Sequence, residues 1–217
     1  MTEAWDTWSK IFAGQYEEAL LLIREDDWSK GHNEGLLLLA LGRVEQAAAS
    51  FSQTSNEASS HYIMLGTCAW LEGRLADALL LWKDAQEPVY QDAAGGVISR
   101  ALCFYAAVRL GDEGEQKQAL KGLKKIWKPT KTLWPAPVAG FLLGRYPEDE
   151  FTWHEFSAPP ELEERRQVQR EFWKGVERLK RDDLAGAKGY FEQSYRPLGT
   201  GILEVEHFLA RHELERL

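Results

Sequence analysis

The chain of 217 residues has little cysteine or methionine, with two of each. Two thiols without a supporting cluster of His or Cys cannot complete a tetrahedral zinc site, so metal binding and a disulfide are both disfavoured. Cys68 and Cys103 each lie in an apolar helical run, where a small thiol packs readily. We therefore expect both cysteines to be reduced core residues.

The sequence also lacks a long hydrophobic run. Its longest apolar stretch, residues 35–42, falls well short of the roughly 18 apolar residues that a membrane-spanning helix requires. Near the N-terminus, Glu3 and Asp6 stand where a signal peptide needs basic residues. We expect a cytoplasmic protein that makes no membrane contact.

Positive charge is scarce in the first half of the chain. Residues 1–116 carry 8 Lys and Arg against 18 Asp and Glu, a net charge of −10, whereas residues 117–217 carry a net charge of +2. Such an acidic half repels phosphate backbones and attracts basic proteins. The charge pattern therefore argues against nucleic-acid binding and predicts a partner with a basic surface.

The chain contains an internal repeat. Each copy has a turn residue, an alanine five residues later and a large apolar residue nine residues later. The four copies are Gly14, Ala19 and Ile23; Gly42, Ala47 and Phe51; Gly73, Ala78 and Trp82; and Asp182, Ala187 and Phe191. In the last three copies another glycine stands seven residues before the turn: Gly35, Gly66 and Gly175.

This pattern resembles the tetratricopeptide repeat (TPR), in which Leu-Gly marks one helix and Ala-x3-Phe marks the next. The likeness covers residues 1–90 and 165–217, although the turns are only 28 and then 31 residues apart, fewer than the usual 34 or so. Small residues let two antiparallel helices approach, and the large residue fills the space between hairpins. The resemblance implies an all-α, TPR-like solenoid of helical hairpins.

A further hairpin is predicted with its turn at Gly114, followed at the repeat offsets by Ala119 and Leu123. The later segment from Trp134-Pro135 to Gly144-Arg145, with a closing repeat and a final helix, is similar to bacterial TPR proteins of the NlpI lipoprotein type. Those proteins act as adaptors, often as dimers, so a homodimer is an expectation here. We recognise no lipoprotein signal in the sequence, so we do not expect the envelope location to carry over.

The repeats and prolines together suggest three regions. Residues 1–128 form an N-terminal TPR-like array, and residues 129–160 form an irregular, proline-containing connection with a short helix. Residues 161–217 then form a closing hairpin and a capping helix. We expect this last helix, from Ile202 to Leu217, to keep one polar outer face, as the end of a solenoid requires.

The residues that commonly carry catalysis are not arranged as a recognisable site. His207 and His212 are five residues apart rather than four, and no metal-binding or phosphate-binding motif is present. We expect no catalytic residue, no metal and no cofactor. The rival hypothesis is an enzyme with an unrecognised site in the loop from Phe151 to Pro160, which contains His154.

Runs of like charge have ordinary structural explanations. The pairs Asp26-Asp27 and Asp182-Asp183 stand at predicted helix boundaries, where carboxylates cap helices. A basic cluster around Trp127 contains Lys117, Lys121, Lys124, Lys125, Lys128 and Lys131, and the helical spacing of the first five predicts one solvated face.

In TPR proteins the first helix of each hairpin lines a concave groove that binds a partner. Transferring those positions by their offset from the turns gives Trp8, Phe12, His32, Leu36, Ile63, Thr67 and Trp70. Either a protein partner or the chain's own later helices fill this apolar groove, and the sequence does not decide between them. The leading hypothesis is a non-catalytic bacterial adaptor or scaffold, and the alternative within the same class is an immunity protein that neutralises a basic toxin.

Overall fold

A computed structural model describes residues 2–23, 30–128, 134–145, 147–151, 160–196 and 199–217. Throughout these ranges the regular structure is helical, with one isolated backbone bridge between Ala58 and Tyr90. The all-α prediction is confirmed. None of the helices in the described ranges is long and apolar enough to cross a membrane.

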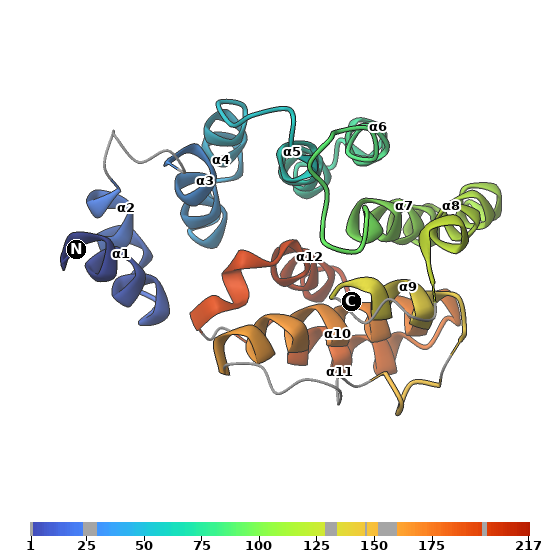
Figure 1. Cartoon of the computed structure of the whole chain (residues 1–217). Coiled ribbons are helices and arrows are strands. Elements are labelled where there is room, and N and C mark those ends of the chain that lie inside the picture. The colour runs from blue at the N-terminus through green and yellow to red at the C-terminus, as the bar shows by residue number, and fades with distance from the viewer. Residues whose placement is uncertain (1, 24–29, 129–133, 146, 152–159, 197–198) are drawn as a thin grey trace.

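Most of the helices pair as antiparallel hairpins (Figure 1). The pairs are α1 (Thr2–Phe12) with α2 (Tyr16–Leu22), α3 (Lys30–Ala40) with α4 (Val44–Phe51), α5 (Ser59–Leu71) with α6 (Leu75–Asp84), α7 (Val97–Leu110) with α8 (Glu113–Ile126), and α10 (Pro160–Lys180) with α11 (Leu184–Ser194). Three helical elements of the described residues lie outside these hairpins: α9 (Ala136–Leu142), the 3-10 helix η1 (Gly199–Leu203) and α12 (Val205–Leu214).

Every hairpin turn closes in the same way. At Gly42, which has a φ of +75°, the amide donates to the carbonyl of Leu39, and the next amide, of Arg43, donates to Leu38 over 2.8 Å. Glycine favours this left-handed conformation because it has no Cβ. The same pair of bonds closes the turns at Gly14, Gly73, Gly111 and Asp182.

The turn of the fourth hairpin lies at Gly111, so the predicted turn at Gly114 is wrong by three residues. Helix α8 begins at Glu113, and the Asp112 carboxylate caps it by accepting from the amide of Glu115. Three residues make almost one helical turn, so the shift still leaves Ala119 and Leu123 on the buried face. The predicted buried face of α8 is therefore correct, although the predicted position of the turn before it is wrong.

The predicted close approach of paired helices is confirmed where glycine meets a large side chain. A Cβ added to Gly66 would lie 2.6 Å from the ring of Trp82, closer than side chains normally approach. The corresponding distances are 2.5 Å from Gly35 to Phe51 and 2.6 Å from Gly175 to Phe191. In each of these three hairpins, the second helix rests its large residue directly on the glycine of the first.

Helices α1 to α8 form an arc, and the C-terminal helices lie on its inner side (Figure 1). Helix α12 packs against α5, α10 packs against α7, and η1 contacts both α1 and α3. The buried side chains join into one hydrophobic core that runs from Ile11 in α1 to Ala210 in α12. The arc is therefore filled from within by the end of the same chain.

The predicted capping helix is not a cap with a polar outer face. All side chains from Val205 to Ala210 are buried, including Glu206 and His207. Helix α12 lies between the arc and the α10–α11 hairpin, so these residues have no solvent-facing side. Both cysteines are buried and free, as predicted, and burial raises the pKa of each thiol to about 12.

Candidate functional site

The seven predicted groove residues divide into two groups. Leu36, Ile63, Thr67 and Trp70 are buried, and Trp70 is only 1% exposed. In the first hairpin and at the start of the second, Trp8 and His32 are half-buried and Phe12 is 44% exposed. Leu36, Ile63, Thr67 and Trp70 are therefore not accessible to a partner in this conformation, because the chain's own helices cover them.

Trp70 belongs to a buried network that joins α5, α7 and α12. Its ring centroid lies 5.1 Å from that of Tyr105, and its indole N–H donates to the Tyr105 hydroxyl over 3.0 Å. That hydroxyl in turn donates to the carboxylate of Glu213, which forms an ion pair with Arg109 at 3.2 Å. Burial and the adjacent carboxylate raise the pKa of Tyr105, and burial raises the pKa of Glu213.

A second polar contact attaches α12 to the arc. The guanidinium of Arg211 donates to the carbonyl oxygens of Leu39 and Ala40, over 3.3 and 3.5 Å, at the C-terminal end of α3. A cation at that end is favoured by the helix dipole. Arg211 and Glu213 thus hold α12 to two separate helices of the arc.

A pocket of about 180 Å³ opens between the start of α7, the first half of α10 and the residues just before α9 and α12. Its lining combines apolar and charged side chains, among them Ile98, Trp134, Leu162, Arg165 and Glu204. Arg165 forms an ion pair with Glu204, whose pKa burial raises. The pocket is smaller than the roughly 300 Å³ at which organic ligand sites usually begin.

Behind this pocket lies Glu206, a buried carboxyl group held by neutral donors. The amide of Gln169 donates to its two oxygens over 3.2 and 3.3 Å, and the indole of Trp173 donates over 3.1 Å. Trp134 donates to the oxygen of the same Gln169 amide. Burial and the nearby charge of Glu204 raise the pKa of Glu206 to about 8.

This network can hold a proton near neutral pH, but it does not form a reaction centre. Glu206 does not line the pocket, and Gln169 stands between them. The described residues contain no group of three His, Cys, Asp or Glu side chains placed to hold a metal ion. The arrangement is that of a polar core which fixes α12 against α10.

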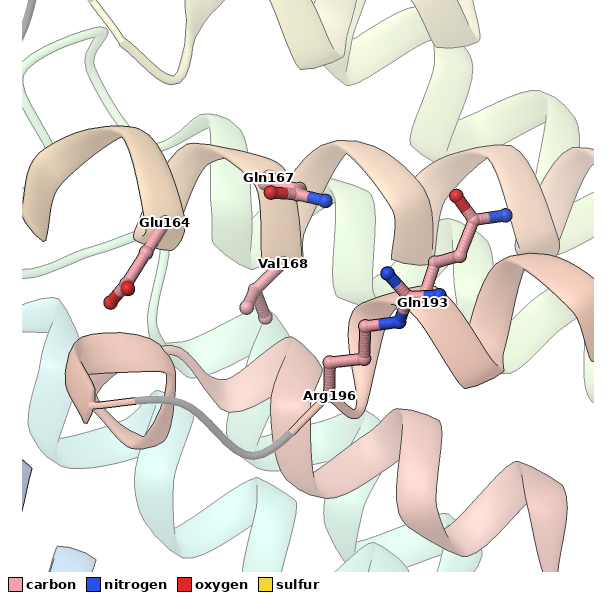
Figure 2. A pocket seen from close by; sticks show the side chains of 5 residues that line it. All are labelled: Glu164, Gln167, Val168, Gln193 and Arg196. Carbon is pink, nitrogen blue, oxygen red and sulfur yellow. The ribbon is translucent and has the colours of Figure 1, made fainter. Parts of the chain in front are cut away.

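A smaller hollow of about 110 Å³ lies between α10 and the end of α11. Figure 2 shows Glu164, Gln167 and Val168 on α10 facing Gln193 and Arg196 near the end of α11. Its lining carries one acid and one base, and the side chains other than Val168 are at least partly exposed. Because the lining carries both a negative and a positive side chain, the hollow does not favour a ligand of either charge.

The largest of these hollows, about 350 Å³, lies at the end of the third hairpin. It is lined by Asn56, Tyr62, Asp84, Glu87 and Pro88. Next to Pro88 in the sequence, Val89 is 84% exposed and Tyr90 is 63% exposed. The sequence analysis did not identify this hollow because its lining comes from two segments, residues 56–62 and 84–88, that are separated along the chain.

The structure also places several of the charged residues that the sequence singled out. Asp183 caps α11 by accepting from the amide of Gly186, as predicted. The lysines of the basic cluster that the structure describes, Lys117, Lys121, Lys124, Lys125 and Lys128, are exposed, as expected for a solvated face. The pair Asp26-Asp27, Lys131 and residues 152–159, which include His154, lie outside the described residues.

Fold and site together define an all-helical protein of repeated hairpins whose polar centre is internal. No family model matches the chain, and no curated protein matches its sequence.

Proposed function

We propose that this chain is a non-catalytic, TPR-like protein–protein interaction module that binds a protein with a basic surface. The repeated turn geometry and the recurring contact of glycine with a large side chain support the TPR-like assignment. Fold alone never identifies a function, so the proposal depends on the charges of the exposed surface.

The observation that carries the proposal is an acidic outer surface on which several exposed carboxylates form no ion pair with another described residue. Exposed acids without an ion pair occur along the arc, within the described residues, at Glu18, Glu45, Glu57, Asp84 and Glu87. The exposed arginines that directly precede α4 and α6 are already paired, Arg43 with Glu17 and Arg74 with Glu72 and Asp77. A basic partner would compensate the remaining carboxylates and would be steered toward them.

The same acidic surface suits an immunity protein that occludes a basic toxin, and this is the second candidate within the class. An adaptor and an immunity protein differ in what they bind rather than in how. The enzyme hypothesis receives no support from a described residue, because its loop lies mostly outside the described ranges.

The test is affinity capture with the full chain, followed by titration of the purified captured protein at two ionic strengths. We expect a basic protein that binds directly, with an association rate that falls as salt is added. Failure to recover any direct binder, together with a tightly bound metal or nucleotide in the purified chain, would contradict the proposal.

A further inference from the structure

We propose that the partner docks at the end of the third hairpin, inserting an arginine or lysine side chain into the hollow beside Tyr62 and packing apolar surface on Val89 and Tyr90. This inference rests on the proposed function and names the surface through which it acts. It replaces the concave groove as the binding face.

The hollow has the lining that a basic side chain requires. Its two charged residues, Asp84 and Glu87, are both acidic, and none of its lining residues is a cation. Tyr62 supplies an aromatic ring and Pro88 an apolar wall, against which the aliphatic stem of an arginine or lysine packs while its charge meets the carboxylates.

The position of Asp84 argues against a purely structural explanation of these acids. Acids in the first turns of α2, α4 and α6, such as Glu17, Glu45 and Asp77, complement the positive end of a helix dipole. Asp84 is instead the last residue of α6, where a carboxylate meets the negative end. The adjacent cation, Lys83, is paired with Glu115 at 2.9 Å and leaves Asp84 uncompensated.

The surface is held in shape before a partner arrives. The Tyr90 backbone accepts from the amide of Ser59 over 2.8 Å and donates to the carbonyl of Glu57 over 3.0 Å. The side-chain amide of Gln91 donates to the carbonyls of Gln86 and Pro88, over 2.7 and 3.1 Å. Val89 and Tyr90 are therefore presented by a bonded loop, which lowers the entropy that binding must overcome.

The aromatic wall is also fixed. The ring of His61 meets that of Tyr62 edge-on at 4.9 Å, and its Nδ1 is 2.9 Å from the hydroxyl of Thr54. Tyrosine is favoured as a binding anchor, and this surface carries Tyr62 in the hollow and the exposed Tyr90 in the loop that follows Pro88. The occupant is a basic partner rather than a second copy of this chain, because the first half of each copy carries a net charge of −10.

The test uses the ¹⁵N-labelled full chain and the acetylated, amidated peptide Gly-Arg-Ala-Arg-Gly, with citrulline replacing both arginines in a matched peptide. We expect the arginine peptide to shift the backbone amide signals of Tyr62, Glu87 and Val89, and the uncharged peptide to bind about tenfold more weakly or not at all. The double variant Asp84→Asn, Glu87→Gln should lose at least about tenfold in affinity. The control variant Asp149→Asn, Glu192→Gln removes the same charge at exposed positions outside the arc and should bind like the wild type.

Equal binding of both peptides, equal losses in both double variants, or signal changes confined to other helices would overturn the assignment of this surface. The proposed function is judged separately with the captured protein. If that protein binds the Asp84→Asn, Glu87→Gln variant and the control variant with the wild-type affinity, the interaction module stands and this docking surface falls. If no direct binder is recovered while the peptide results hold, the surface is a cation site and the proposed function fails.

Discussion

Glu206 is a residue whose burial disfavours the ionised form of its carboxyl group. Its carboxyl group is fully buried and is held by neutral amide and indole donors. Its pKa is raised to about 8 from an ordinary value of 4.5, so the folded state binds a proton that the unfolded state releases between these values. The stability due to this proton is complete below the unfolded pKa and is lost as the pH rises through the folded pKa.

The first prediction follows from the direction in which this proton changes stability with pH. The free energy of unfolding of the wild type, relative to that of Glu206→Gln, should fall by about 1.4 kcal/mol for each pH unit between the two pKa values. Urea denaturation of both proteins between about pH 5 and pH 9 measures the difference, and contributions from other groups, such as His207, largely cancel. Parallel pH profiles for the two proteins would show that Glu206 does not carry the buried proton.

Trp70 provides the second prediction at this scale. The Trp70→Ala variant should lose about 3–5 kcal/mol of stability, because a large buried side chain is removed. Trp70→Phe should cost less and remain folded, while losing the donor to Tyr105. Its affinity for the captured partner should equal that of the wild type in a titration, whereas weaker binding by a fully folded Trp70→Phe would restore the groove hypothesis.

At the scale of the element, each hairpin depends on a few residues whose roles are geometric. The turn needs a residue that tolerates positive φ, and Asp182, with φ +58°, takes the place of glycine in the last hairpin. In the α3–α4, α5–α6 and α10–α11 hairpins, a glycine of the first helix also lies under the large side chain of the second helix. These requirements are local, which is why spacing in the sequence predicted these hairpins.

The third prediction compares two helical glycines. Gly66→Ala forces a Cβ to within 2.6 Å of Trp82 and should destabilise the protein by about 1–3 kcal/mol. Gly189→Ala, in α11, meets no atom within 4 Å and should be neutral or stabilise by up to about 1 kcal/mol. Thermal unfolding distinguishes them, and similar melting temperatures for both variants would mean that the α5–α6 contact is looser than described.

At the scale of the whole molecule, the sequence predicted the helical class and most hairpins but not how the ends of the chain meet. The placement of α12 depends on contacts such as Glu213 with Tyr105, which lie 108 residues apart and leave no mark in local spacing. The polar residues of α12 suggested a solvent-facing side, yet Glu206 and Glu213 find their partners inside the molecule. The same long-range packing covers Trp70, so the burial of Leu36, Ile63, Thr67 and Trp70 could not be inferred from repeat offsets.

The arc therefore encloses the C-terminal helices of the same chain. Its exposed charged and aromatic side chains lie on the outer surface and at the ends of the hairpins. The central claim is that a basic partner binds there without displacing α12. Hydrogen exchange of the full chain, with and without the captured partner, tests this claim directly because it reports each backbone segment separately. We expect slower exchange around Tyr62 and in residues 84–91, with α12 unchanged. Faster exchange in α12 combined with protection of α3 and α5 would contradict the account, because it would mean that the partner opens and occupies the groove.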